Sequence, residues 1–145
     1  MQQRYFIQLS FKGTHFCGWQ KQPDSPSVQV AIEKVLSVLL KQPIDIVGAG
    51  RTDTGVHATY YVAHFNAPVE INDTTSFVYH LNKILPFDIA IQSIFKVNNE
   101  AHARFNAVSR SYEYQCVVQK NPFKTETSVL LKSYPNVELM NEASE

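Results

Sequence analysis

Cysteine is scarce in this sequence, whose 145 residues contain only Cys17 and Cys116. Two cysteines give neither a disulfide framework nor the paired spacing of a zinc site, so we interpret both as thiols in a reducing cytoplasm. Long hydrophobic runs are also missing. The most hydrophobic one, residues 35–40, is interrupted by Ser37 and is far shorter than the roughly 20 residues of a membrane span. The opening MQQRYFIQLSF lacks the apolar core of a signal peptide, so we expect no membrane association.

Net charge is absent as well, because 13 Lys and Arg residues balance 13 Asp and Glu residues. This balance argues mildly against nucleic-acid binding, but the charges are unevenly placed. Residues 134–145 hold three acids and no base, whereas residues 102–124 hold four bases against the single acid Glu113. Ionic screening limits what distant acids can cancel, so the segment 102–124 can still bind phosphate.

A hydrophobic content of 44% over this length is enough to form the core of one domain. Alternating apolar residues predict strands, and apolar residues at three- and four-residue steps predict helices. The predicted strands cover residues 4–11, 45–47, 61–65, 89–97 and 110–118. The predicted helices follow Ser25 or Ser27 and Asn72 or Asp73, and each ends before a proline, Pro43 or Pro86.

The order β-α-β-β-α-β-β is typical of an α+β, ferredoxin-like fold, an antiparallel sheet with two helices on one face. Such a fold leaves the opposite face of the sheet open, and open sheet faces commonly bind RNA. Fold alone does not establish function, which depends on particular residues.

Glycine is scarce too, and three of the five glycines lie within residues 48–55, in the run GAGRTDTGVHA. Glycine permits positive φ and close backbone approach, so the run predicts a sharply bent loop. Between the glycines lie Arg51, Thr52 and Asp53. A purely structural turn, with Asp53 capping local backbone, remains an alternative. Such a turn does not, however, require an Arg-Thr-Asp triplet held between glycines. We therefore interpret Asp53 as a candidate catalytic carboxylate.

Other chemistries match the loop less well. A phosphate-binding loop needs Gly-Lys-Ser/Thr before a helix, whereas these glycines precede Arg-Thr-Asp and a strand. A zinc site from Asp53, His57 and His64 lacks a supporting helix motif or cysteine pair. A glycosidase needs two carboxylates across one bond, and only Asp53 lies in this loop. One carboxylate beside one arginine suits nucleophilic or base chemistry.

The run GAGRTDTGVHA resembles the catalytic loop of the tRNA pseudouridine synthase A family, which usually has Ala where this chain has Thr54. Four further segments are similar to those of the family, in the same order along residues 4–118. They are FKGTHFCGWQKQ, SVQVAIEKVL, LNKILPFDIAI and HARFNAVSRSYEY. The loop and the Arg-x-Tyr-x-Tyr strand are the specific signals.

The resemblance implies an enzyme that isomerises uridine to pseudouridine in the anticodon stem-loop of tRNA. By position, Asp53 takes the nucleophilic role and Tyr112 stacks on the target base. Arg51 holds the site open after the nucleotide flips, and Arg110 is our favoured phosphate contact. The resemblance implies tRNA as partner, a homodimer, and neither cofactor nor metal.

The resemblance also implies a second domain of similar fold that completes the active site. We therefore expect residues 1–133 to form the catalytic-loop domain, and residues 134–145 to begin a linker. We expect this chain to have little activity alone. Two other functions remain open: a non-catalytic RNA-binding module, and a self-associating domain whose uncovered sheet face pairs with another copy.

Overall fold

The computed structural model describes residues 2–144. The chain divides into two compact units, residues 1–109 and residues 110–145. The first unit contains β1 (Gln3–Phe11), the 3-10 turn η1 (Gly13–His15), α1 (Val28–Leu40), β2 (Ile46–Gly48), β3 (Ala58–Ala67), α2 (Thr74–Ile84) and β4 (Ile89–Lys96). The second contains β5 (Cys116–Val117), β6 (Val129–Leu130) and α3 (Val137–Glu142).

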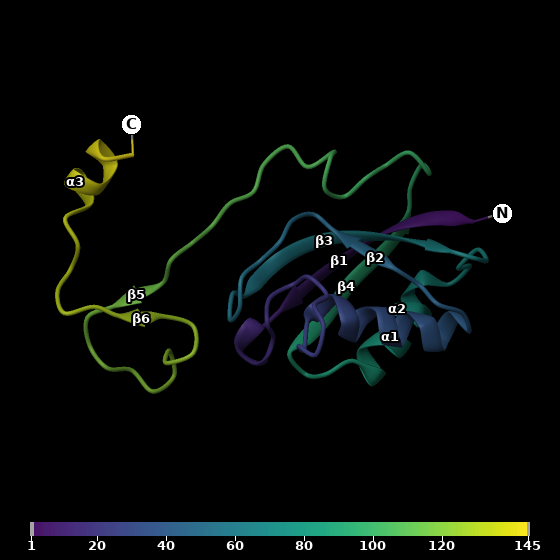
Figure 1. The fold of residues 1–145 in the computed structure, drawn as a ribbon, viewed down its shortest axis with the longest axis horizontal. Helices are drawn as coiled ribbons and strands as arrows, with labels where there is room; N and C mark the ends of the chain where they lie inside the picture. Colours follow the sequence, from purple (N-terminus) through teal and green to yellow (C-terminus); the bar gives the residue numbers. More distant parts are fainter. Residues whose placement is uncertain (1, 145) are drawn as a thin grey trace. The chain divides into compact units, whose positions relative to one another are not determined.

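The first unit is a four-stranded antiparallel sheet in the order β2-β3-β1-β4. Both helices of this unit cover one face of the sheet (Figure 1). This arrangement confirms the ferredoxin-like α+β fold that the sequence predicts. The core lies between the sheet and the helices, and it contains alternate β1 residues such as Ile7 and Leu9 together with α1 residues such as Ile32 and Leu36.

Local capping explains where the two helices begin. The Ser27 side chain accepts a hydrogen bond from the N–H of Val30, and that of Asp73 accepts one from the N–H of Ser76. Each cap satisfies an N–H that has no partner inside its helix. Of the two candidate caps that the sequence offers for each helix, the structure therefore selects Ser27 and Asp73.

The sheet face opposite the helices is partly covered, rather than fully open as the sequence predicts. The N–H of Ala103 donates to Nδ1 of His64 on β3 at 3.1 Å. The guanidinium of Arg4 on β1 donates to the carbonyl of Ala101 at 2.9 Å. These bonds hold residues 101–103 across one end of the sheet, so the end nearer the β2–β3 loop is the part that remains accessible.

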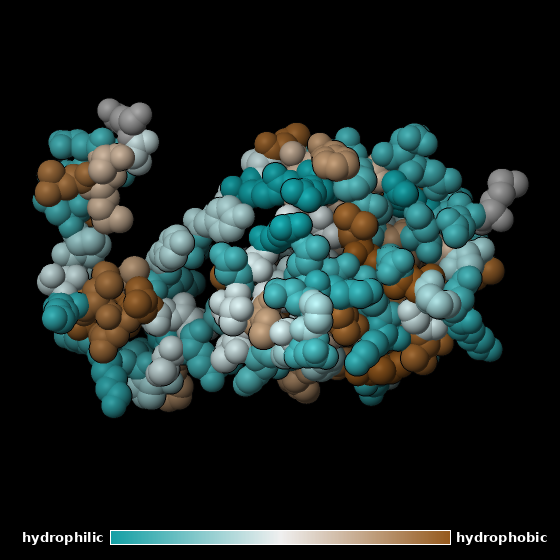
Figure 2. All heavy atoms as spheres, in the orientation of Figure 1, coloured by the Kyte–Doolittle hydropathy of each residue, from teal (hydrophilic) through white to brown (hydrophobic). Residues whose placement is uncertain are grey.

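The predicted strand over residues 110–118 is wrong in its extent, because only Cys116–Val117 form a strand, β5. This strand pairs with β6 in parallel rather than extending the main sheet. None of residues 110–144 is buried, and Figure 2 shows hydrophobic groups at the surface of this unit. Alternation of apolar residues specifies an extended backbone, but pairing also needs a neighbouring strand and a face to bury.

The division into a domain over 1–133 and a linker from 134 stays a prediction, and α3 lies within the predicted linker range. Within residues 2–144, none of the helices has both the length and the apolar character that a membrane span requires.

Candidate functional site

The glycine-rich segment forms the loop between β2 and β3, over residues 49–57. Both charged side chains of the Arg-Thr-Asp triplet, those of Arg51 and Asp53, are exposed to solvent. No ion pair joins them within the described chain. The loop thus presents a carboxylate and a guanidinium that a substrate can reach.

The segment after β1 holds this loop from one side through three hydrogen bonds. The N–H of Trp19 donates to the carbonyl of Thr52 at 3.3 Å, and the N–H of Gly55 donates to the carbonyl of Phe16 at 3.3 Å. The N–H of Gly13 donates to Nδ1 of His57 at 2.9 Å. Residues on both sides of Asp53 are therefore fixed, and we call residues 13–19 the brace.

Two glycines make this close approach possible. A Cβ at Gly13 would lie 2.0 Å from the carbonyl oxygen of Val56, and a Cβ at Gly18 would lie 2.1 Å from that of Thr52. Gly18 also has a φ of +79°, which L-residues rarely adopt. The brace can therefore lie against the loop backbone only because both residues lack a side chain.

Aromatic side chains support the loop from the core. The hydroxyl of Tyr61 on β3 donates to the carbonyl of Gly50, and it accepts from the N–H of Gly50 at 3.3 Å. The buried Trp19 packs on Tyr61 with 4.4 Å between ring centroids, so Trp19 belongs to the core. A Cβ at Gly48 would lie 2.1 Å from the Tyr61 hydroxyl, so this glycine also makes room for the contact.

Within the loop, the N–H of Val56 donates to the carbonyl of Asp53 at 3.2 Å. The hydroxyl of Thr52 is the one buried side-chain oxygen or nitrogen of residues 2–144 that has no hydrogen-bond partner. The backbone around Asp53 is thus tied at positions 52, 53, 55 and 56, and the side chain of His57 adds a further bond, while the Asp53 carboxylate is exposed. Preorganised backbone with a free functional group is a common requirement of catalysis.

His57 in the loop and His64 on β3 each accept a hydrogen bond from a backbone N–H. Nδ1 of His57 accepts from Gly13, and Nδ1 of His64 accepts from Ala103. Burial, together with nearby Arg4 and His102, lowers the pKa of His64 from 6.5 to about 4. Residues 2–144 contain no group of three or more His, Cys, Asp or Glu side chains that could hold a metal.

Of the four predicted site residues, the structure places Arg51 and Asp53 together on the loop. Arg110 and Tyr112 belong to the second unit, where both are exposed, Tyr112 by 71%. Their membership of the same site as Asp53 stays a prediction.

Sequence reasoning missed the brace itself. The sequence pattern does not connect Gly13 and Gly18 to the loop that follows some 35 residues later. A signal was present, because two glycines in a segment otherwise rich in aromatics indicate close backbone contact. The sequence does not identify which backbone makes that contact.

Comparison with known proteins finds a match that spans both the loop and the brace. The sequence model of the family described as tRNA pseudouridine synthase matches residues 8–106. This range contains the loop, the brace, β2 and β3, and the last part of β1. It ends before Arg110 and Tyr112.

The chain is also similar to curated proteins named tRNA pseudouridine synthase A. That of Azobacteroides pseudotrichonymphae genomovar. CFP2 is 52% identical over 141 residues, which cover 97% of this chain and 56% of the relative. That of Parabacteroides distasonis is 47% identical, with the same coverage, and that of Treponema denticola is 37% identical over 97% of this chain and 55% of the relative. The chain spans about half the length of these relatives. With more than half of its residues matched by the family model, the chain belongs to the tRNA pseudouridine synthase family.

Proposed function

We propose that this chain supplies the catalytic aspartate of an enzyme that isomerises uridine to pseudouridine in tRNA. The observation that carries the proposal is the Asp53 loop, whose backbone is held by the brace and by Tyr61 while its carboxylate is exposed. The names of the relatives support tRNA as the substrate.

Asp53 acts on a nucleotide that has left its stack. Isomerisation breaks the N-glycosidic bond, rotates the base and rejoins it to the sugar through carbon. Substrate and product contain the same atoms, so the reaction needs no co-substrate. The Asp53 carboxylate supplies the nucleophile or base. Flipping the nucleotide costs a few kcal/mol, which protein contacts must offset.

The other predicted residues have roles in this step. Arg51, two positions before Asp53, holds the site open once the nucleotide has flipped. Tyr112 stacks on the target base, which is worth roughly 1–3 kcal/mol. Arg110 contacts phosphate. The anticodon stem-loop as target, a homodimeric assembly and a cytoplasmic location rest on the family resemblance alone.

Measuring pseudouridine in a tRNA transcript, with chemical tagging and reverse-transcription stops, tests the proposal. The protein at its full natural length should modify the transcript, and Asp53→Ala and Asp53→Asn should abolish modification. Activity of either variant at the unaltered rate would contradict the assignment. The same assay on residues 1–145 alone tests the expectation that this chain turns over slowly.

A salt series separates the two non-catalytic alternatives from each other. Binding of the transcript to an RNA-binding surface weakens steeply with salt, because binding releases counterions from phosphates. Self-association through an apolar sheet face does not weaken in this way. An Asp53→Ala variant that binds the transcript but does not modify it supports catalysis by Asp53 over both alternatives.

A further inference from the structure

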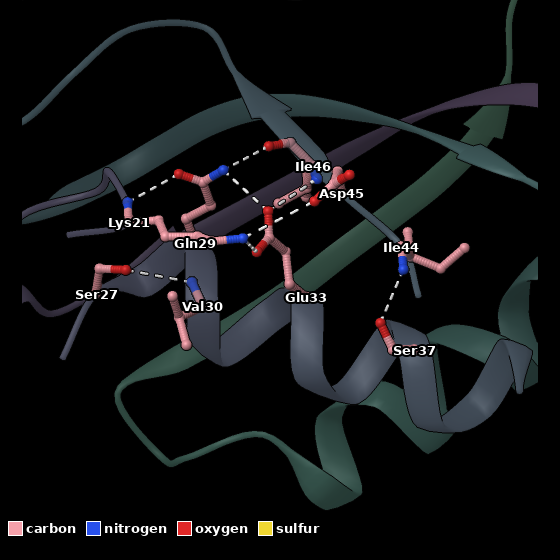
Figure 3. Close-up of polar contacts among 9 residues, drawn as sticks. All are labelled: Lys21, Ser27, Gln29, Val30, Glu33, Ser37, Ile44, Asp45 and Ile46. Atoms are coloured by element: carbon pink, nitrogen blue, oxygen red, sulfur yellow. Dashed lines mark hydrogen bonds and ion pairs between the residues drawn. The ribbon is translucent and has the colours of Figure 1, made fainter. Parts of the chain in front are cut away.

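Two polar side chains of α1, Gln29 and Glu33, lie one helical turn apart and point toward β2 (Figure 3). Glu33 is only 8% exposed, although it is an acid on a helix that packs against the core. Acidic side chains are rarely buried to this extent unless they are paired. The partners of this pair therefore indicate what it does.

Together the two side chains bind both backbone groups of one residue, Ile46, in edge strand β2. The N–H of Ile46 donates to Oε1 of Glu33 at 3.2 Å, and Nε2 of Gln29 donates to the carbonyl of Ile46 at 3.0 Å. Nε2 of Gln29 also donates to Oε1 of Glu33 at 2.9 Å, which fixes the pair internally. An edge strand has backbone groups without a neighbouring strand, and here a helix supplies their partners.

The same pair holds the segment that follows the brace. The N–H of Lys21 donates to Oε1 of Gln29 at 2.9 Å, and Nζ of Lys21 donates to Oε2 of Glu33 at 3.3 Å. The backbone N–H of Gln29 donates to the carbonyl of Trp19 at 3.0 Å, and Trp19 in turn donates to Thr52. Gln29 and Glu33 thus connect β2, which leads into the Asp53 loop, with Trp19 at the end of the brace and with Lys21 just after it.

We propose that Gln29 and Glu33 are positioning residues, which set the placement of the Asp53 loop by fixing β2 relative to the brace. The inference rests on the proposed function of Asp53. Neither side chain bonds to the loop itself in the described residues, so both act through backbone. Their hydrogen bonds are directional, and they specify one register between α1, β2 and the brace.

A hydrophobic pair at these positions would bury apolar surface without fixing that register. Removing either side chain leaves a backbone group of Ile46 without that partner, which should cost about 1–3 kcal/mol of stability and also remove the geometric specification. The proposal predicts that kcat falls in such variants even at temperatures at which they remain fully folded. A role confined to stability predicts an unaltered kcat in the folded variants.

The test uses Glu33→Leu, Gln29→Met and Glu33→Gln in the protein at its full natural length. Glu33→Leu and Gln29→Met should lower kcat by about 10- to 100-fold with little change in the KM for tRNA, because a shift of about 1 Å in a catalytic group can cost about 100-fold. Glu33→Gln keeps an oxygen for the N–H of Ile46 and should retain kcat within about threefold of the unaltered protein. If Glu33→Leu fails to fold, Gln29→Met decides, since it leaves the bond between Glu33 and the N–H of Ile46 in place.

Ser37→Ala is the matched control. Oγ of Ser37 accepts from the N–H of Ile44 at 2.9 Å, so it also joins α1 to the chain before β2, but one turn further from the loop (Figure 3). This variant should lose about 1 kcal/mol of stability and keep kcat. Unaltered kcat in both Glu33→Leu and Gln29→Met would overturn the proposal, as would a loss in Ser37→Ala equal to theirs.

Amide hydrogen exchange separates failure of this inference from failure of the proposed function. Glu33→Leu should speed exchange of the N–H groups of Trp19 and Ala49, which hold the loop and its entry, but not that of Ile7 in the core. If Asp53→Ala proves active, the proposed function fails, and the exchange rates still test the positioning. If Asp53→Ala is inactive while Glu33→Leu changes neither exchange nor kcat, only the positioning proposal fails.

Discussion

Gly18 and Thr52 are in direct backbone contact. A Cβ at position 18 would lie 2.1 Å from the carbonyl oxygen of Thr52, which also accepts the N–H of Trp19 at 3.3 Å. Thr52 immediately precedes Asp53. The position of the candidate catalytic carboxylate is therefore tied to a glycine that lies far from it in the sequence.

Gly18→Ala should displace the loop and lower activity. The added Cβ cannot occupy a site 2.1 Å from a carbonyl oxygen, so either the brace or the loop must move. The positive φ adds about 1–2 kcal/mol of destabilisation. We expect kcat for pseudouridine formation to fall by about 10- to 100-fold. Kinetics on a tRNA transcript, with the free energy of unfolding from urea titration, would measure both effects.

Gly55→Ala is the matched control for that variant. Gly55 has a similar φ of +80°, but a Cβ there would meet no atom within 4 Å. The two variants share the conformational cost and differ in the clash. Activity should thus fall much further in Gly18→Ala, and equal losses in the two variants would refute a specific role for the Gly18–Thr52 contact.

Tyr61→Phe should weaken the loop from the side of the core. The change removes the hydroxyl that bonds to both backbone groups of Gly50, and it should cost about 1–3 kcal/mol of stability because those groups lose a buried partner. Tyr5→Phe is the control, because its hydroxyl accepts from the N–H of Ile71 at 2.9 Å, away from the loop. Both variants should be destabilised in thermal unfolding, but only Tyr61→Phe should lower kcat.

Most of the first unit could be predicted from local sequence patterns. Alternation in residues 4–11 and the three- and four-residue spacing after Ser27 reflect which face is buried, and burial decides these elements. The glycine cluster around Asp53 predicted a bent loop for the same kind of reason, because the conformation of glycine is a local property.

The parts that the sequence did not predict depend on partners distant along the chain. Alternation around Tyr112 resembles that of a strand, yet no strand pairs with these residues within the described chain, and Tyr112 and Tyr114 are exposed. The contact of Gly18 with Thr52 and the bonds of Glu33 to Ile46 likewise join segments separated in sequence. No periodicity encodes which backbone group a glycine or a buried acid will meet.

Tyr112→Ala should reduce kcat/KM for tRNA if this ring stacks on the flipped base. Loss of a stacking contact worth roughly 1–3 kcal/mol corresponds to about 5- to 150-fold in kcat/KM. Tyr112→Phe keeps the ring and should retain most of the activity. Tyr114→Ala removes a neighbouring tyrosine that is 90% exposed and should have little effect. Equal effects of Tyr112→Ala and Tyr114→Ala would remove the basis for assigning the stacking role to Tyr112.

His64 should make the folded state less stable in mild acid. Its ring is buried beside Arg4 and His102, and its pKa is lowered from 6.5 to about 4, so the unfolded chain binds this proton more readily than the folded one. Stability should therefore fall as pH drops from about 6.5 to about 4, by at most about 1.4 kcal/mol per pH unit from this group. In His64→Asn, an amide oxygen can still accept from Ala103 but does not titrate. Urea titrations at several pH values should give a shallower decline for His64→Asn, and identical slopes would show that His64 does not cause the acid sensitivity.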